Sequence, residues 1–553
     1  MVPGLLRAEA QTGSSAQTVR VRFLAERSEF VDTIYGIFRR QVQDRCGAAV
    51  KLFGTGDVTV EFAIDPDIGA EGFRIEDGDG GAVRIVGNDE QGLLYGVGKF
   101  LRTSRYDQGG FGPGSWRGTS VPDCPFRAAY FATHFGNWYQ SAPRYEIERY
   151  IEDVALWGFN TWVFTFPVDA YPSFQAAEGH IKQLRALMAT AKRVGLEVAV
   201  GNAVNNALTT APTEIAATQP PGKPPGGGIV CPSIPAGREY LLDIWRQTMR
   251  AFSDVGGGID YICVAPYDTG GCGCEQCMPW ASNGYLRISK DVIEQEKTVN
   301  PECKLILSTW LFDAAEWEGL HQALGTDSYD GWVDYIMAGG IVVSGMDGYP
   351  QYPLDHGTPS NIPLVNFRDI SMWGMQPWGG YGANPQPERF QKLWRAESRM
   401  LAGGILYSEG IYEDINKAIN GQLFWTKDGD TEDTVREYIA FEYSPDVVDD
   451  VLAAIHILEG SLTTAFGSTE RDNITESVCE AHDLITKAEA KLSPRARNSW
   501  RWRILSLRAT IDNELFNNQG KLEGPVLKRA FDELTEIYHA ENTTPGLQPP
   551  KLP

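Results

Sequence analysis

The sequence predicts an α/β protein: a (β/α)8 barrel with a small α+β domain before it and a helical domain after it. Three observations predict this architecture. Eight short apolar runs alternate with amphipathic helical stretches after Pro125, which is the pattern of parallel strands and crossover helices. The residues before Pro125 mix strand and helix patterns, and those beyond about residue 430 show helical spacing only. The predicted domains are residues 1–122, 123–429 and 430–553.

The first domain shows alternating apolar residues in four short segments and helical spacing in two longer ones. The run Asp77-Gly-Asp-Gly-Gly81 predicts a hairpin turn between two of the strands. Asn88 is the predicted N-cap of the second helix. Residues 106–125 are rich in Gly, Pro and Ser and predict a linker. The predicted strands are residues 19–24, 58–64, 73–76 and 83–86, and the first helix is 29–43.

The barrel is predicted from eight apolar runs with helices between most of them. The sixth unit is the weakest, because no helix is evident between Ala338 and Ile362. The predicted strands are residues 128–132, 161–166, 197–201, 261–265, 304–309, 335–338, 364–367 and 404–407. Predicted helices of the barrel include 145–157, 181–194, 238–253, 286–296 and 387–401. Those of the last domain are 434–442, 446–459, 474–490, 499–516 and 527–540.

The composition is that of a globular protein, with 42% hydrophobic and 22% charged residues among 553. No apolar stretch is long enough to predict a membrane span, and no apolar segment near the N-terminus predicts a secretory signal. The nine cysteines are odd in number, and most stand singly, which is not the pattern of a disulfide framework. These features favour a reducing, cytoplasmic location.

The charge and the aromatic content indicate which classes of molecule the protein binds. The chain carries 72 acidic and 49 basic residues, a net charge of −23, which disfavours nucleic acid. Its 15 tryptophans together with the surplus of carboxylates suit a cleft that binds sugars. The sequence contains no glycine-rich nucleotide loop and no Gly-x-Ser-x-Gly nucleophile elbow, so we expect no cofactor in catalysis.

Side chains that could hold a sugar follow nearly every predicted strand. In a barrel of this kind the active site lies at the carboxyl ends of the strands. Any barrel has some polar residues there, so the collection is more informative than its members. The predicted substrate-binding residues are His134, Asn137, Trp138, Asn202, Tyr267, Trp310, Asp313, Asp369, Trp373, Trp378, Tyr412 and Glu413.

Two carboxylates are the predicted catalytic pair, because glycoside cleavage needs an acid and a base or nucleophile. Asp268 follows the fourth strand and is the predicted general acid. Glu409 follows the eighth and is the predicted base or nucleophile, with Gly410 permitting a tight turn. Glu413 and Asp414 start the next helix, where the helix dipole alone favours acidic residues. Asp313, Asp369 and Glu413 are reserves for either role.

A cysteine cluster follows Asp268. Cys272, Cys274 and Cys277 provide three thiols within six residues, and Cys231 is the candidate fourth ligand of a structural zinc ion. Such a site would fix the loop that carries Asp268. The alternative is three free thiols in a tight loop.

The first domain resembles a known family. Phe73-Arg-Ile-Glu76, Val83-Arg-Ile-Val-Gly-Asn-Asp89 and Gly92-Leu-Leu-Tyr-Gly-Val97 are similar to the small domain that precedes the barrel in β-N-acetylhexosaminidases and α-glucuronidases. The resemblance covers residues of about 15–105 and extends to the barrel as architecture. The stretch from Asp268 to Cys277 looks like that of poorly characterised glycoside-hydrolase-like proteins with the same plan.

This resemblance implies an exo-acting glycoside hydrolase. The hexosaminidases carry an Asp-Glu pair after strand four, whereas this chain has Asp268-Thr269, a departure that puts their substrate-assisted mechanism in doubt here. In the α-glucuronidases a strand-four acid faces carboxylates on later strands. Asp268 would match that acid, with Asp369 or Glu409 opposite.

We therefore expect a glycosidase that removes a terminal sugar from an oligosaccharide or glycoside. One alternative is a carbohydrate-binding protein without hydrolytic activity. Another is a lyase or isomerase of a sugar acid, which needs a basic residue in the cleft, and Arg368 is the strand-end candidate. The sugar, its anomer and the formation of a homo-oligomer stay open.

Overall fold

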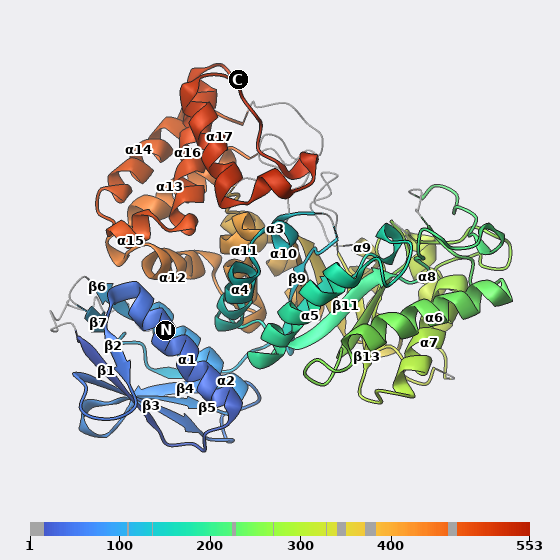
Figure 1. The fold of residues 1–553 in the computed structure, drawn as a ribbon, viewed down its shortest axis with the longest axis horizontal. Coiled ribbons are helices and arrows are strands. Elements are labelled where there is room, and N and C mark those ends of the chain that lie inside the picture. Colours follow the sequence, from blue (N-terminus) through green and yellow to red (C-terminus); the bar gives the residue numbers. More distant parts are fainter. Residues whose placement is uncertain are drawn as a thin grey trace. The chain divides into compact units, whose positions relative to one another are not determined.

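The computed structural model describes residues 16–107, 110–134, 136–223, 228–268, 270–327, 329–339, 350–370, 383–462 and 473–553. The chain forms two compact units, with the boundary between Val121 and Pro122. Figure 1 shows the first unit in blue and the second in the remaining colours.

The first unit is a six-stranded sheet with two helices on one of its faces (Figure 1). The strand order is β2-β1-β3-β5-β4-β8, and β4 runs antiparallel to both of its neighbours. A separate two-stranded ribbon joins β6 and β7. The elements are β1 (Thr18–Phe23), α1 (Glu29–Cys46), β2 (Ala49–Lys51), β3 (Val58–Ile64), β4 (Phe73–Asp77), β5 (Val83–Gly87), α2 (Glu90–Thr103), β6 (Arg105–Asp107), β7 (Gly110–Gly112) and β8 (Gly118–Ser120).

The sequence predicted most of this unit and was wrong in two details. The hairpin between β4 and β5 is present. However, α2 is capped by Asp89, whose carboxylate accepts the N–H of Gly92, whereas the Asn88 side chain accepts the N–H of Gly69. The predicted linker contains β8, which pairs with β4 and completes the sheet. Three residues carry too little hydrophobic pattern to be recognised as a strand.

The second unit contains a closed barrel of eight parallel strands. All eight runs predicted from the sequence are strands of this barrel, in the predicted order. They are β9 (Phe126–Phe131), β10 (Thr161–Thr165), β11 (Glu197–Ala203), β12 (Tyr261–Ala265), β13 (Lys304–Ser308), β14 (Tyr335–Ala338), β15 (Leu364–Asp369) and β16 (Leu401–Ser408).

Helices lie around the barrel and cross between its strands. In the sixth unit, where the sequence showed no evident helix, the described part between β14 and β15 contains one short helix, α9, and residues 340–349 lie outside the described residues. The helices are α3 (Trp138–Ser141), α4 (Arg144–Leu156), α5 (Glu178–Arg193), α6 (Pro235–Phe252), α7 (Gly284–Lys297), α8 (Ala314–Leu324), α9 (Gln351–His356), α10 (Pro387–Glu397) and α11 (Asp414–Trp425).

The barrel interior is filled by side chains, so it is a core and not a channel. Phe126 packs against the rings of Tyr261 and Tyr335, with centroids 5.4 and 5.0 Å away. Smaller side chains such as Ala128 and Ala199 fill the space between the larger ones. The described side chains therefore leave a ligand no room inside the barrel itself.

The chain after the barrel is helical, as predicted, and packs onto α10, α11 and α4. Arg501 donates to Asp414 on α11 at 2.7 Å and to Asp153 on α4 at 2.9 Å. Arg508, fully buried, donates to Asn384 at 2.6 Å and to Asp512 at 2.9 Å. Buried and paired charges of this kind fix a unique packing because neither partner can be left alone at low cost. The helices are α12 (Thr431–Glu442), α13 (Val448–Gly460), α14 (Ser477–Glu489), α15 (Pro494–Arg497), α16 (Trp500–Asn517) and α17 (Pro525–Ile537).

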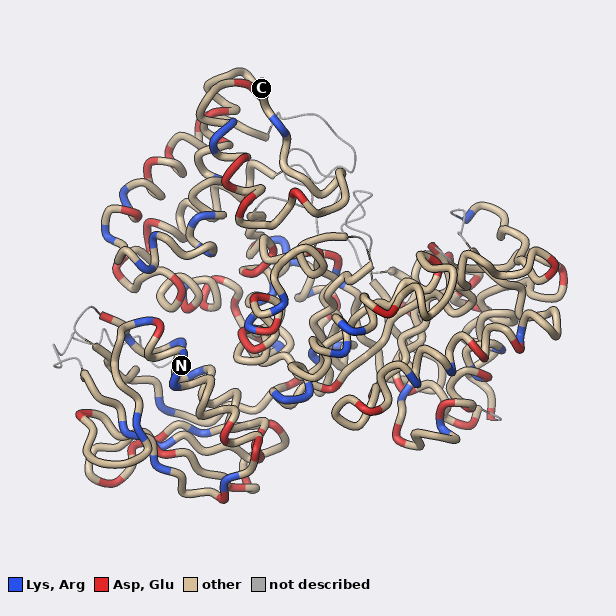
Figure 2. Tube along the Cα trace, viewed as in Figure 1, with Lys and Arg blue, Asp and Glu red and all other residues tan. Residues whose placement is uncertain are grey.

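Two features of the whole chain bear on its partners. Within the described residues no helix is both long and apolar enough to cross a membrane. Figure 2 shows acidic and basic positions interspersed along the elements of each unit. The acidic surplus therefore comes from many sites and not from one charged segment.

Candidate active site at the barrel mouth

Two neighbouring strands deliver carboxylates to the barrel mouth. Alternate residues of a strand face the same side. Ile405 belongs to the interior core, so Tyr407 and Glu409 face the same way above it. On β15, Val365 belongs to the interior core, and the same alternation places Asp369 on the inward-facing side of the strand. Glu409 and Asp369 thus lie together at the carboxyl ends of β16 and β15.

Glu409 is buried, with 2% of its surface exposed. The Tyr407 hydroxyl donates to its Oε1 at 3.1 Å, and no described group hydrogen-bonds to its Oε2. Burial, together with the charges of Glu413 and Asp369, raises the pKa of Glu409 well above its ordinary value. A buried carboxyl oxygen without a partner is uncommon and marks a position where a ligand group would complete the hydrogen bonding.

Glu413 supports Glu409 from the next turn of the chain. It accepts hydrogen bonds from the Ser408 hydroxyl and from the backbone N–H of Glu409, the latter at 3.1 Å. Lys417 Nζ lies 3.7 Å from Glu413 Oε2 and donates to the Gly410 carbonyl at 2.7 Å. Burial raises the pKa of Glu413 to about 8 and lowers that of Lys417 to about 8. Glu413 therefore holds the loop that carries Glu409.

Gly410 is needed for space and not for a left-handed turn. Its φ is 174°, which is extended backbone, and the chain bends at Glu409 and Gly410. A Cβ at this position would lie 2.4 Å from Cε1 of Tyr412. Any larger residue would displace the Tyr412 ring and with it the loop of Glu409.

Aromatic rings surround the carboxylates. The Tyr407 ring lies 5.2 Å from Tyr130 and 5.6 Å from Phe367, and Trp310 packs edge-on against Phe367 at 5.3 Å. The half-buried His134 lies 6.2 Å from the Tyr407 ring. Burial lowers the pKa of His134 to about 4, so its imidazole is neutral at neutral pH. Two of the predicted substrate-binding residues, Trp310 and His134, therefore border the carboxylate cluster.

Asp268 reaches the mouth from the other side of the barrel. It follows β12, which lies four strands from β16 in the ring of eight. Its backbone has a φ of +80°, and its side chain is exposed. Partial desolvation nevertheless raises the pKa of its carboxyl. Its charge contributes to the raised pKa of Tyr130 on β9, so its field extends over the mouth.

Four of the predicted substrate-binding residues hold protein groups. The side-chain amide oxygen of Asn137 caps α3 by accepting the N–H of Tyr139, and the Asp313 carboxylate caps α8 by accepting the N–H of Glu316. Asn202 donates to the Phe166 carbonyl at 3.0 Å. The Tyr267 hydroxyl donates to Glu316. These side chains build the loops, and a role in sugar binding for them remains a prediction.

Other predicted residues contact the helical region. Trp138 lines a hollow of about 1010 Å³ between α4 and the helical region, together with Trp500 and Arg503. The Tyr412 ring packs on Tyr538 from the end of α17, with centroids 5.1 Å apart, and no described group hydrogen-bonds to either hydroxyl. Trp373 and Trp378 lie outside the described residues.

Arg368 does not face the mouth. It alternates with Phe367 and Asp369 and points outward, where it pairs with Glu397. The same carboxylate accepts from Asn366 at 2.9 Å. The basic residue that a lyase or isomerase mechanism needs is therefore not supplied by Arg368.

The sequence reasoning missed several residues of the site. Tyr407 could have been predicted from the sequence, because the alternation that turns Ile405 inward turns Tyr407 inward too. Lys417 lies one helical turn after Glu413, a spacing that places the two on one face. Tyr538 carried no local signal, because it reaches Tyr412 only through the packing of the helical region.

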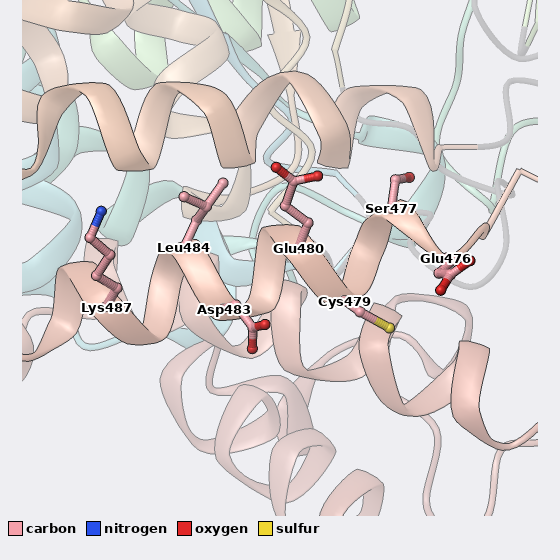
Figure 3. Close-up of a pocket in the computed structure, with 7 residues that line it drawn as sticks. All are labelled: Glu476, Ser477, Cys479, Glu480, Asp483, Leu484 and Lys487. Atoms are coloured by element: carbon pink, nitrogen blue, oxygen red, sulfur yellow. The ribbon is translucent and has the colours of Figure 1, made fainter.

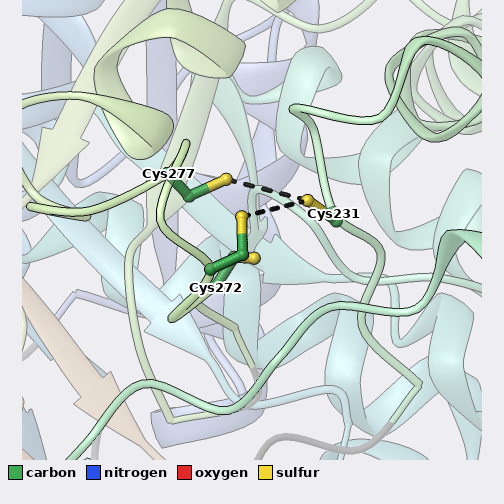
Figure 4. Close-up of side chains that lie close together, drawn as sticks. Cys231, Cys272 and Cys277 are labelled. Carbon is green, nitrogen blue, oxygen red and sulfur yellow. Dashed lines mark hydrogen bonds between the residues drawn. The ribbon is translucent and has the colours of Figure 1, made fainter.

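The four predicted metal-ligating cysteines come together in space. Figure 4 shows three of them, Cys231, Cys272 and Cys277. The sulfur atoms of all four lie within 4.8 Å of one another. The two segments that supply them precede α6 and follow β12. The thiols are thus placed as the sequence predicted, far apart along the chain and close in space.

A second hollow, of about 590 Å³, lies on α14 (Figure 3). Its lining side chains, which include Cys479, Glu480 and Lys487, come from this helix and the residue before it. It belongs to the helical region and has no connection with the strand ends of the barrel.

Comparison with solved structures shows that the fold is shared with glycoside hydrolases. A GH115 4-O-methyl-α-glucuronidase with specificity for decorated arabinogalactans matches with a TM-score of 0.61 and 11% identity, over 96% of this chain and 78% of that chain. A family 89 glycoside hydrolase from Clostridium perfringens matches with a TM-score of 0.61 and 12% identity, over 92% and 64% of the two chains. The GH20 β-N-acetylhexosaminidase from Streptomyces coelicolor A3(2) matches with a TM-score of 0.52 and 15% identity, over 78% and 93%.

No protein-family model matches the chain, and no curated protein matches it in sequence. The likeness to hexosaminidases and α-glucuronidases expected from the first domain is thus confirmed as a shared fold. The reaction must be argued from the barrel mouth itself.

Proposed function

We propose that this protein is an exo-acting glycoside hydrolase that cleaves a terminal sugar at the carboxyl ends of the barrel strands. The observation that carries the proposal is the buried Glu409 carboxyl with an unpartnered oxygen, next to Asp369 and across the barrel from Asp268. Glycoside cleavage uses two carboxyl groups on opposite sides of the scissile bond. The fold shared with known glycosidases supports this reading.

The electrostatics favour roles opposite to those expected from the sequence. A general acid must hold its proton until the transition state, which a raised pKa ensures. Glu409 meets this requirement, because burial and two neighbouring carboxylates disfavour its charged form. Its Oε2 is then the oxygen that would donate to the glycosidic oxygen of the substrate.

Asp268 is suited to the opposite role. Its exposed carboxyl is accessible to water, and no described carboxylate contributes to the shift of its pKa. It would activate a water molecule, or attack the sugar directly, from the side of the ring away from Glu409. A separation of about 6.5–9.5 Å between the two carboxyl groups in the substrate complex implies inversion, and about 5–5.5 Å implies retention. Asp369 is the alternative partner for Glu409.

The aromatic side chains would position the sugar. The rings of Trp310 and Tyr407 are flat apolar surfaces on which a pyranose can stack. The imidazole of His134 is neutral at neutral pH and can donate or accept a hydrogen bond from a hydroxyl without adding charge. The combination of flat rings and carboxyl groups is typical of sugar-binding sites.

The test is a panel of aryl glycosides with the full chain. The panel covers α and β anomers of common hexoses, pentoses, uronic acids and N-acetylhexosamines, and Asp268→Asn is assayed beside the wild type. We expect release of the aryl group from at least one member and its loss in the variant. Release that persists unchanged in Asp268→Asn would remove this residue from the mechanism.

Absence of release from every member, with a sugar that raises the Tm in thermal-shift titration, would contradict the hydrolase proposal. That result would favour the alternative of a sugar-binding protein on the same fold. The unpartnered oxygen of Glu409 would then accept or donate a hydrogen bond to a bound sugar hydroxyl.

A further inference from the structure

Two loops bring four thiols into one buried group. Cys231 stands just before α6, and Cys272, Cys274 and Cys277 follow β12. Three of the four side chains are buried, and that of Cys274 is half-buried. We call this group the four-cysteine cluster. Figure 4 shows the sulfur atoms of Cys231 and Cys277 directed toward each other.

The spacing of the sulfur atoms identifies the ligand. Cys231 Sγ lies 3.6 Å from Cys274 Sγ and 3.8 Å from Cys277 Sγ. A disulfide needs about 2.05 Å between sulfurs, so these pairs are not disulfides. In a tetrahedral zinc site with Zn–S bonds of about 2.3 Å, neighbouring sulfurs are about 3.8 Å apart. The observed separations are those of thiolates around a single metal ion.

We propose that the four-cysteine cluster binds one structural Zn²⁺ ion. Four protein sulfurs leave no open coordination position, which is the mark of a structural and not a catalytic zinc site. Sulfurs that all lie within 4.8 Å suit one ion better than the larger iron–sulfur clusters.

Hydrogen bonds and glycines hold the two segments of the cluster close together. Asn205 bridges the two segments by donating to the carbonyls of Val230 at 3.0 Å and Gly271 at 2.9 Å. A Cβ at Gly237 would lie 2.3 Å from the Cys231 carbonyl oxygen, and one at Gly273 would lie 2.6 Å from the Gln219 carbonyl oxygen. The loops can approach this closely only because both positions are glycine.

A hydroxyl group and a guanidinium group lie beside the four-cysteine cluster. Arg287 donates to the Ser233 hydroxyl at 3.0 Å, and that hydroxyl lies 2.9 Å from Cys277 Sγ. Four thiolates and one Zn²⁺ leave a net negative charge, and the Arg287 guanidinium offsets part of it. Outer groups of this kind orient metal ligands.

The metal would fix the loop that delivers Asp268. Cys272 lies four residues after Asp268. The side chain of Asn205 accepts the N–H of Gly271, so Asn205 and the four-cysteine cluster together hold the segment that follows Asp268. This consequence rests on the proposed function, because Asp268 matters for activity only if the protein is a hydrolase. The metal content itself does not depend on the reaction.

The experiment is elemental analysis of the full chain, purified without added metal and without chelator. We expect about one equivalent of zinc in the wild type and less than about a tenth in Cys274→Ser. Cys479→Ser is the matched control, because Cys479 is also a half-buried thiol but lies on α14, and it should keep its zinc. Exchange with Co²⁺ should give the visible absorption of a tetrahedral cobalt thiolate in the wild type and in Cys479→Ser.

Less than about a tenth of an equivalent in the wild type, before and after incubation with zinc, would overturn the proposal. So would stoichiometric iron in place of zinc. The wild-type measurement decides the matter even if Cys274→Ser fails to fold. Because these readouts are metal content and absorption, a protein inactive on every glycoside would leave the zinc proposal intact.

Discussion

The two sides of the barrel mouth use their polar residues differently. On the side of β15 and β16, Glu409 and Asp369 point inward from the strands, and Glu409 retains an oxygen without a described partner. On the side of β11 to β13, Asn202 donates to the Phe166 carbonyl after β10, and Asp313 accepts the N–H of Glu316 in its own loop. Asp268 is the exception on that side, because it is exposed and its backbone is held at a positive φ.

The difference distinguishes polar residues that stabilise the loops from polar residues that remain available to a ligand. A polar residue that satisfies a helix end or a turn contributes stability and is not available to a substrate. A buried carboxyl left incompletely bonded is costly and is retained only where it has a task. Under the proposed function, the β15–β16 side would supply the reacting group, and the β11–β13 side would hold the loop that presents its partner.

The largest effect is expected from Glu409→Gln. The amide keeps the size and the hydrogen bond from Tyr407 but cannot donate a proton to a leaving group. We expect kcat to fall by at least about a hundredfold on an aryl glycoside that the wild type cleaves. The Tm should not fall, because a buried ionisable group is removed. A variant with most of its activity would exclude Glu409 from the chemistry.

Asp268→Asn tests the exposed side of the same pair. We expect a loss in kcat of about a hundredfold, because the amide cannot act as a base or nucleophile. Its Tm should match the wild type, because the side chain is exposed. Steady-state kinetics with the same glycoside give the comparison with Glu409→Gln. Full activity with a lowered Tm would assign Asp268 to the loop structure instead.

Asp313→Ala should lower the stability of the protein without lowering its activity. The Asp313 carboxylate caps α8 and forms a capping box with Glu316, so its loss should cost about 1 kcal/mol of unfolding free energy. Denaturant unfolding measures this cost, and kcat should stay near the wild-type value. A large loss of kcat at unchanged stability would show that Asp313 contacts the substrate.

The smallest effect concerns pH. Burial raises the pKa of Glu413 from 4.5 to about 8, so between these values the folded protein keeps a proton that the unfolded chain has released. The free energy of unfolding should therefore fall as the pH rises through this window. Lys417, whose pKa is lowered to about 8, contributes with the opposite sign at higher pH.

Glu413→Gln removes the first of these two contributions. Its Tm should fall less than that of the wild type between pH values of about 5 and 8, with Glu432→Gln on the exposed surface as control. An identical pH dependence in Glu413→Gln and the wild type would show that Glu413 does not titrate there.

The comparison also shows what the sequence can and cannot predict. The eight strands were predictable, because buried parallel strands form apolar runs that helices separate. The rule that active sites lie at strand ends found Glu409 and Asp369, but it equally selected Asn137, Asp313 and Tyr267, which hold protein groups. A list of strand-end residues does not say which side chains cap a helix.

Other features of the structure depend on contacts between distant parts of the chain. Trp138 turns toward the helical region, and Tyr538 from that region packs on Tyr412. The four-cysteine cluster was predictable because three of its thiols are close in sequence, whereas its geometry required the packing of two loops. The roles proposed for Glu409 and Asp268, opposite to those expected from the sequence, rest on burial, which no local pattern reports.

The central claim is that Glu409 gives the proton and Asp268 acts from the other side. The most direct measurement is kcat/KM for Glu409→Gln and Asp268→Asn on two glycosides of the same sugar, one with an acidic leaving group and one with a basic leaving group. We predict that Glu409→Gln loses far more activity with the basic leaving group, which needs the proton, whereas Asp268→Asn loses activity equally with both. The reverse pattern would contradict this assignment and restore Asp268 as the acid.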